Sequence, residues 1–148
     1  MNREIKFRVF DEERELMGVV TEITYYDNGS GPCWVRVNIP QLAHLQSYYQ
    51  SNFIEKTAIL MQYTGLKDRN NNEIYEGDIL EITGNYNPGK YIVMWDDYRV
   101  AWWGKSIKCD KRERQHDDDY YQLLGSWQDE ITEVIGNIYE NPELLEVE

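Results

Sequence analysis

The sequence predicts a mainly-β domain, with a strongly bent sheet or a small open barrel and one short helix. Three observations support this fold class. Short runs in which apolar and polar residues alternate recur along the chain, and Gly- and Asn-rich turns separate them. Aromatic residues make up 14% of the 148 residues, with 12 Tyr and 5 Trp, and both types favour half-buried, pleated surfaces. Because no repeat or low-complexity linker divides the chain, residues 1–148 are expected to form a single domain.

The first three strands are expected before Pro40. In EIKFRVF, Ile5, Phe7 and Val9 alternate with charged residues, which is the period of a half-buried strand. The run LMGVVTEITYY is rich in β-branched and aromatic residues and stops at DNGSGP. Asn and Gly accept positive φ, so this segment favours a turn. WVRVNI then alternates again and gives the third strand.

The short helix is expected directly after these strands. Pro40 ends the alternation and suits the first turn of a helix. From Gln41 to Phe53, Leu42, Leu45 and Tyr49 recur three and four residues apart, which is the spacing of one helical face.

Further strands are expected in TAILMQY, EIYEGDILEIT, YIVMWDD, YRVAWW, YYQLLGSW and EVIGNIYE. Gly77 interrupts the second of these and indicates a bulge or a close backbone approach. The third and fourth are expected to form a hairpin around Asp96 to Tyr98. In NPELL, Asn141 can cap and Pro142 can begin one helical turn. The sheet should resemble Src-homology-3-like barrels, with much of the core supplied by Ile74, Ile79, Ile82, Ile92, Met94, Val134, Ile135 and Ile138.

The charge balance excludes one class of partner. The formal net charge is −12, whereas general affinity for nucleic acid depends on Lys and Arg that neutralise phosphates. The acidic surface is either simply solvated or docks onto a basic partner. One segment is locally basic and contains Lys105, Lys108, Lys111, Arg112 and Arg114. Because acidic residues and His116 lie among and directly after these residues, the segment is interpreted as an exposed loop of mixed charge.

The cell compartment follows from the cysteines and from the N-terminus. Cys33 and Cys109 are the only two cysteines, and a secreted domain of this size more often carries a larger framework. The opening MNREIKFRVF has no apolar core and no cleavage site of small residues. No apolar stretch approaches the ~18 residues of a membrane span. We therefore expect a protein of the cytoplasm that does not enter a membrane.

The loop KDRNNNE is the best candidate for chemistry. Aligned on a calcium loop, Asp68, Asn70 and Asn72 occupy the first, third and fifth ligand positions. However, Glu73 replaces the Gly of the sharp turn, and Ile79 replaces the bidentate Glu. Asn and Asp bond to neighbouring backbone and tolerate left-handed φ. The loop is therefore interpreted as a hairpin turn.

Other catalytic patterns are absent from the sequence. NGSGP lacks the spacing of a phosphate loop, and no Ser lies in Gly-x-Ser-x-Gly. His44 has no ligand partner in the pattern. His116 and the following acids belong to an extended segment, in which adjacent side chains point in opposite directions. We expect no enzymatic activity, no catalytic residue, no metal ligand and no cofactor.

Three segments, REIKFRVFD, LMQYTGLKDRNNNEIYEGDIL and EVIGNIYENPELL, resemble in order and spacing the signature of the YopX-like family of phage and prophage proteins. They cover both ends and the centre of the chain. The resemblance implies a small, mostly-β protein encoded by a bacteriophage or prophage, and it carries over no catalytic residues. The central loop of that family commonly has a Gly near Asn71 or Asn72, which this chain lacks.

Two functional hypotheses follow, both without catalysis. In the first, the chain binds a host protein or associates with itself through an aromatic surface of Trp95, Tyr98, Trp102 and Trp103, since Tyr and Trp anchor such contacts. In the alternative, it imitates DNA and inhibits a host protein that binds nucleic acid. The mimic surface would comprise Asp129, Glu130, Glu133, Glu140, Glu143, Glu146 and Glu148. The aromatic interface is favoured, because an acidic tail is more often solvated than recognised.

Overall fold

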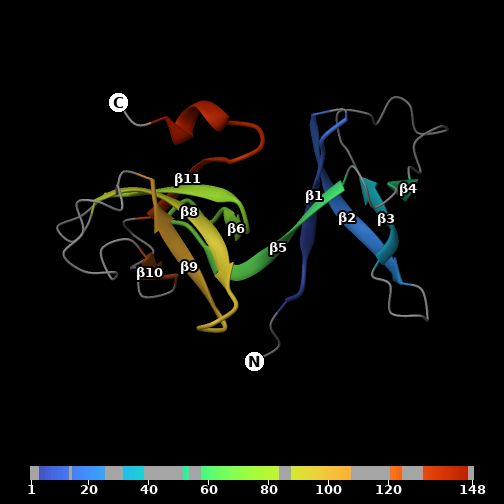
Figure 1. Cartoon of the computed structure of the whole chain (residues 1–148), viewed down its shortest axis with the longest axis horizontal. Helices are drawn as coiled ribbons and strands as arrows, with labels where there is room; N and C mark the ends of the chain where they lie inside the picture. The colour runs from blue at the N-terminus through green and yellow to red at the C-terminus, as the bar shows by residue number, and fades with distance from the viewer. Residues whose placement is uncertain are drawn as a thin grey trace. The chain divides into compact units, whose positions relative to one another are not determined.

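The computed structural model describes residues 4–13, 15–25, 32–38, 52–53, 58–83, 88–107, 121–124 and 132–146. Their regular structure consists of β1 (Phe7–Asp11), β2 (Leu16–Tyr25), β3 (Pro32–Asn38), β4 (Asn52–Phe53), β5 (Ala58–Lys67), β6 (Glu73–Tyr75), β7 (Asp78–Ile82), β8 (Gly89–Asp96), β9 (Ala101–Ser106), β10 (Tyr121–Leu123), β11 (Thr132–Asn137) and the 3-10 helix η4 (Pro142–Leu145) (Figure 1). This content confirms the mainly-β class. No helix in the described ranges has the length and hydropathy that a bilayer span requires.

The chain divides into two compact units, one spanning Glu4–Gln62 and the other containing Tyr63–Glu148. Strand β5 runs from the first unit into the second. The expectation of a single domain over residues 1–148 stays a prediction.

Strand β1 is central to the first unit. It pairs antiparallel with β2 on one side and with the beginning of β5 on the other, and β3 and β4 extend the sheet beyond β2. Val9 and Phe10 are buried, whereas Ile5 is 72% exposed and precedes the strand. The strand therefore begins two residues later than the pattern of Ile5, Phe7 and Val9 indicated, and its burial does not alternate, because Val9, Phe10 and Asp11 are all buried.

The second unit contains an antiparallel five-stranded sheet in the order β10-β9-β8-β7-β11. As the described residues form it, this sheet is open, with β10 and β11 at its edges, and Figure 1 shows β8 and β9 as its long central hairpin. Its core cluster comprises Ile74, Leu80, Val93, Trp102 and Leu124, with Leu66, Trp95 and Val134 packed against it.

The predicted core is right in part. Ile74, Ile79 and Ile82 are buried, but Ile92, Met94, Val134, Ile135 and Ile138 are only half-buried. On β8 the fully buried positions are Tyr91 and Val93, which have the opposite parity to the predicted ones. Both parities of this strand are apolar, so alternation alone did not identify its inner face.

The β8–β9 hairpin forms as predicted, but the segment YRVAWW begins with a turn. Tyr98 and Val100 belong to the turn, and β9 starts at Ala101. The Asp96 carboxylate accepts hydrogen bonds from the N–H groups of Tyr98 and Arg99, at 3.0 and 2.8 Å. This local capping ends β8 at Asp96 although the residues that follow have high β propensity.

Gly77 confirms the expected close backbone approach. It has a φ of +79° and separates β6 from β7. Its N–H donates to the Val93 carbonyl, and its own carbonyl accepts from the Ile138 N–H, each at 2.9 Å. A side chain here would lie 3.2 Å from the Tyr139 ring, so both the φ and the space favour glycine.

The predicted helix over Gln41–Phe53 lies outside the described residues, except that Asn52–Phe53 form β4. The DNGSGP turn lies outside them up to Gly31. The helical turn in NPELL is confirmed as η4. The Asn141 side chain does not cap it, which corrects the expected role. Instead, Asn141 Oδ1 accepts from the Asn137 N–H at 3.2 Å.

Candidate functional site

The loop between β5 and β6 is a hairpin turn, as the sequence predicted. The two strands pair antiparallel, with Lys67 opposite Glu73. Within the loop, the Asp68 N–H donates to the Asn72 carbonyl, and the Asn71 N–H donates to the Asp68 carbonyl, each at 2.9 Å. Asn71 has a φ of +66°, a left-handed conformation that asparagine tolerates.

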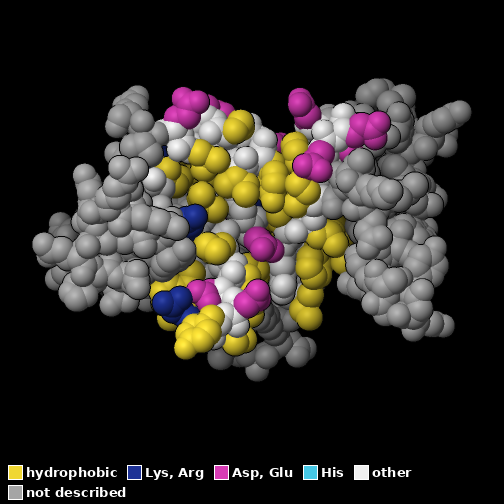
Figure 2. All heavy atoms as spheres, viewed as in Figure 1, with side chains coloured by type: hydrophobic (Ala, Val, Ile, Leu, Met, Phe, Trp, Pro, Cys, Tyr) yellow, Lys and Arg dark blue, Asp and Glu magenta, His cyan; other side chains and the backbone are white. Residues whose placement is uncertain are grey.

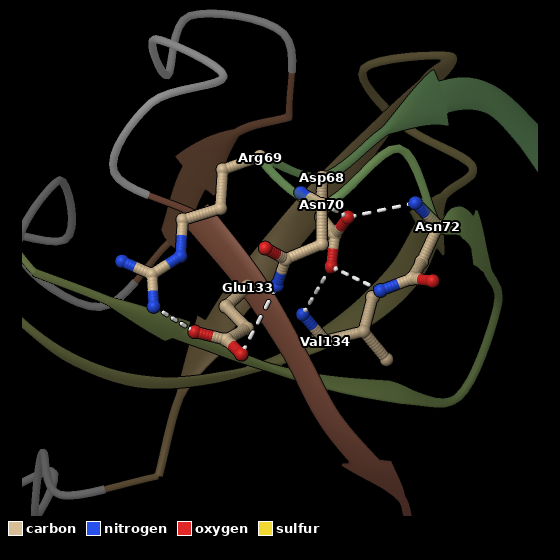
Figure 3. Close-up of polar contacts among 6 residues, drawn as sticks. All are labelled: Asp68, Arg69, Asn70, Asn72, Glu133 and Val134. Atoms are coloured by element: carbon tan, nitrogen blue, oxygen red, sulfur yellow. Dashed lines mark hydrogen bonds and ion pairs between the residues drawn. The ribbon is translucent and has the colours of Figure 1, made fainter.

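The Asp68 side chain organises this loop from the inside. The residue is only 4% exposed. Its Oδ1 accepts from the N–H groups of Asn70 and Asn72, at 2.9 and 2.8 Å. Its Oδ2 accepts from Asn72 Nδ2 and from the Val134 N–H, both at 3.0 Å. Figure 3 shows the four donors around one carboxylate.

These bonds set the charge state of Asp68. Burial is the largest single influence and raises the pKa of Asp68. Hydrogen bonds from Val134, Asn72 and Asn70 together outweigh burial and hold this pKa below its ordinary value of 3.8. The carboxylate is therefore ionised at neutral pH.

The Asp68 loop also docks onto the edge strand β11. The Arg69 N–H donates to the Thr132 carbonyl at 3.0 Å. The Glu133 side chain points toward the loop (Figure 3), where it pairs with the Arg69 guanidinium and accepts from Asn70 Nδ2 at 3.1 Å. Together with the Val134 bond, these contacts cover main-chain groups of an edge strand that could otherwise pair with another strand.

This geometry explains the polar pattern without a ligand. Both oxygens of Asp68 are engaged, the Asn72 side chain donates to that carboxylate, and the Asn70 side chain donates to Glu133. Ile79, at the twelfth position of the calcium alignment, is 0% exposed. In the described part of the chain, no three His, Cys, Asp or Glu side chains gather as metal ligands.

Other polar residues of the signature segments have the same kind of role. Asp78 is 1% exposed, and its Oδ2 accepts from the Tyr75 N–H at 2.7 Å. The Thr64 hydroxyl donates to the Ile74 carbonyl at 2.8 Å and accepts from the Leu66 N–H at 3.1 Å. Asp78 thus satisfies a backbone group beside the turn between β6 and β7, and Thr64 satisfies two where the register of β5 with β6 shifts. Buried donors and acceptors need such partners.

The turn that leaves β11 is held in the same way. Asn137 is 5% exposed, and its Oδ1 accepts from the N–H groups of Tyr139 and Glu140, at 3.0 and 2.9 Å. Asn141 folds back over Gly136, where an added Cβ would lie 2.5 Å from Asn141 Oδ1. These roles of Asn137 and Asn141 were not predicted from the sequence. The signal was present, because Asn or Asp shortly before a turn commonly caps the next N–H groups.

The four residues of the predicted aromatic surface do not share one face. Trp95 and Trp102 are cross-strand partners whose rings meet edge to face at 5.1 Å. Trp102 is 8% exposed and belongs to the core cluster, against which Trp95 packs. Trp103 is half-buried, pairs with Met94 and therefore lies on the opposite face of the sheet from Trp102.

Tyr98 is the one member of this set that projects fully into solvent. It is 92% exposed in the hairpin tip, which we define as residues Asp97–Val100 between β8 and β9. Val100 in the same tip is 70% exposed and was not singled out by the sequence. The backbone hydrogen bond from Arg99 is the main reason why the pKa of Asp96, at the base of the tip, is lowered.

The acidic residues proposed for DNA mimicry are only partly available. Glu133 pairs with Arg69, and Glu140 accepts from Asn137 Nδ2 at 2.7 Å. Glu143 and Glu146 are exposed. Several other predictions fall on side chains outside the described part of the chain: Cys33, His44, Cys109, His116, Asp129, Glu130, Glu148 and the basic cluster beyond Lys105.

Comparisons with known proteins agree with this architecture. Protein EF1440 from Enterococcus faecalis is 25% identical, with a TM-score of 0.54 over 98% of this chain and 100% of that chain. YopX from Bacillus subtilis is 21% identical, with a TM-score of 0.55 over 95% of this chain and 98% of that chain, a likeness of fold. Among curated proteins no match was found. The model of the YopX protein family matches residues 6–146, and the chain therefore belongs to the YopX family.

Proposed function

We propose that this chain is a protein-binding module that acts without catalysis and makes contact through the hairpin tip. The observation that carries the proposal is the exposure of two large apolar side chains, Tyr98 at 92% and Val100 at 70%, in a single turn. Figure 2 shows hydrophobic side chains at the end of the β8–β9 hairpin, beside charged ones. Aromatic side chains that can be buried by a partner dominate the energy of protein interfaces.

The use of the polar residues supports the absence of catalysis in this proposal. A catalytic or ligand-binding carboxylate needs an oxygen that faces the substrate or ion. Both carboxylate oxygens of Asp68 accept hydrogen bonds from donors of its own chain, and the Asn137 side chain caps the turn after β11. These structural roles of Asp68 and Asn137 support a function without catalysis for the segments that contain them.

The aromatic hypothesis changes in one respect. Trp95 and Trp102 belong to the core or pack against it, so the proposed contact is centred on Tyr98 and Val100. We prefer this contact to DNA mimicry because Glu133 and Glu140 are engaged with neighbouring side chains. An origin in a phage or prophage, and action in the cytoplasm of the bacterial host, are part of the proposal and rest on the resemblance and the cysteine usage.

Sedimentation of the pure protein, together with capture of partners from bacterial lysate at low and high salt, tests the proposal. We expect an association that survives high salt and is weakened by Tyr98→Ser. Val19→Ser is the matched control, since Val19 is 56% exposed on β2 in the other unit. A monomer without a partner under every condition would refute the proposal. A partner that is lost at high salt and ignores Tyr98→Ser would favour mimicry.

A further inference from the structure

We infer that the hairpin tip is a preformed anchor that binds a basic protein, not a second copy of this chain. That partner would have an apolar pocket that receives Tyr98 and Val100. This inference rests on the proposed function and names the class of partner. Three features carry it: the hydrogen bonds that hold the tip, the strained backbone of Val100, and the charge of the tip and of the chain.

The tip is held in one conformation by the residue at its base. Asp96 Oδ1 accepts from the N–H groups of Tyr98 and Arg99, and Asp96 Oδ2 accepts from Arg99 Nη1 at 2.8 Å. The Arg99 guanidinium also lies 4.9 Å from the centre of the Trp103 ring, at a distance typical of a cation–π contact. An anchor ordered before binding loses less conformational entropy when it binds.

Val100 has an unfavourable backbone conformation in this turn. Its φ is +53°, a left-handed conformation in which a β-branched side chain is a genuine outlier. Glycine or asparagine is the usual residue where a hairpin requires this conformation. At 70% exposure the Val100 side chain gains little from packing within the chain. The left-handed backbone conformation of Val100 is thus not offset by packing of its side chain. Such conformations cluster at functional sites, and here the conformation places an apolar side chain in the same turn as Tyr98.

The net charge of the chain favours a different protein over a second copy of this chain as the binding partner. The chain carries a formal net charge of −12, so two copies repel each other. Within the tip, the Arg99 charge is paired with Asp96, whereas Asp97 is exposed. The tip and its base thus combine exposed apolar groups with one net negative charge, from Asp96 and Asp97 against Arg99, on an acidic chain. A basic surface around an apolar pocket complements both properties.

The contribution of charge and the contribution of the apolar anchor can be measured separately in the binding kinetics. Charge at the rim of an interface acts mainly on the association rate, while a buried anchor acts mainly on the dissociation rate. Higher salt should therefore slow association and leave dissociation nearly unchanged. Tyr98→Ser should speed dissociation by about 30-fold, the effect of a hot-spot side chain.

The first experiment identifies what the tip touches. The photo-reactive amino acid p-benzoylphenylalanine replaces Tyr98 in the full chain inside a bacterial cell, and in a control chain it replaces Val19. We expect an adduct at position 98 and none at position 19. Mass spectrometry should identify the adduct as a protein of net positive charge, which is then purified for kinetic measurement with wild type, Tyr98→Ser and Val100→Asn.

Val100→Asn is the sharpest variant, because stability and binding should change in opposite directions. Asparagine tolerates the left-handed φ, so the free protein should melt about 2–4 °C higher than wild type. The apolar contact is lost, so the purified partner should bind about tenfold more weakly. A purely structural role for Val100 would produce no loss of binding in a more stable protein.

Several outcomes would overturn the inference. They are an adduct with a second copy of this chain or with an acidic protein, equal labelling at positions 98 and 19, and unchanged dissociation of Tyr98→Ser. An adduct with a second copy or with an acidic protein overturns the inference alone and leaves protein binding through the hairpin tip standing. Equal labelling, or unchanged dissociation of Tyr98→Ser, would place the contact elsewhere and overturn the proposed tip contact as well. Absence of any partner for the wild-type chain defeats both.

Discussion

Replacing Asp68 with Asn tests the role of this carboxylate in the loop. The amide can keep one oxygen for the N–H groups of Asn70 and Asn72, which bond to Oδ1. Its NH₂ group must then occupy the place of Oδ2 and face two donors, the Val134 N–H and Asn72 Nδ2. The substitution changes little in volume, so the loss is one of hydrogen bonding alone.

The magnitude follows from these contacts. A donor that loses its acceptor at a buried site costs about 1–3 kcal/mol. Hydrogen bonds to a charged acceptor are also stronger than those to a neutral one. Asn72 is exposed and can turn its side chain to water, so the Val134 N–H accounts for most of the loss. We therefore expect Asp68→Asn to lower the free energy of unfolding by about 1–3 kcal/mol. The melting temperature should fall by roughly 3–10 °C.

Urea unfolding followed by tryptophan fluorescence measures this change. Amide hydrogen exchange at Val134 reports the local loss. Asp97→Asn is the matched control, because Asp97 is exposed in the hairpin tip, and it should change stability by at most about 0.5 kcal/mol. If Asp68→Asn is as stable as Asp97→Asn and exchange at Val134 is unaltered, the Asp68 carboxylate does not hold the loop to β11.

The effect of Asp68 has a defined pH dependence. The folded protein holds the pKa of Asp68 below 3.8, so the native state favours the ionised form more than the unfolded chain does. The stabilisation is fully present above the unfolded value and is lost as the pH falls through the lower, folded value. The difference between wild type and Asp68→Asn should therefore be constant near neutral pH and shrink only below about pH 3.8.

Three further substitutions separate core, turn and surface contributions. Gly136→Ala places a Cβ 2.5 Å from Asn141 Oδ1 and should cost about 1–3 kcal/mol; thermal unfolding should show that Asn141→Ala in the same chain recovers part of this loss. Arg69→Ala removes an exposed ion pair with Glu133 and should cost about 1 kcal/mol or less, an effect that shrinks in high salt. Trp102→Ala empties a core position that is 8% exposed and should cost about 3–5 kcal/mol, so loss of binding by this variant would report unfolding rather than a lost contact.

Sequence patterns predicted the features that depend on neighbouring residues. The Asp68 turn, the break at Gly77 and the helical turn after Pro142 each follow from the conformational preferences of a few adjacent residues. The same local preferences explain the error at Val100. Its β propensity indicated a strand, whereas the Asp96 side chain caps the next N–H groups and closes a turn.

Features that join distant residues were out of reach. The bond between Asp68 and the Val134 N–H spans 66 positions, and nothing in either segment specifies the partner. The inner face of β8 was assigned wrongly because Ile92 and Met94 are as apolar as Tyr91 and Val93. Only the packing of the neighbouring strands decides between the two faces. For the same reason, the sequence could not show that Trp102 belongs to the core while Tyr98 projects into solvent.

Ligand-dependent melting of the full chain tests the central claim most directly, namely that the polar signature residues hold the fold rather than a ligand. The melting temperature is measured with calcium, magnesium, zinc and nucleotides in turn. A ligand at 100 times its dissociation constant would add about 2.7 kcal/mol, which corresponds to roughly 5–10 °C. The carboxylate of Asp68 is already saturated by its own chain, so we predict no shift with any of them. A rise of several degrees that disappears in Asp68→Asn would show a ligand site in the loop and contradict this account.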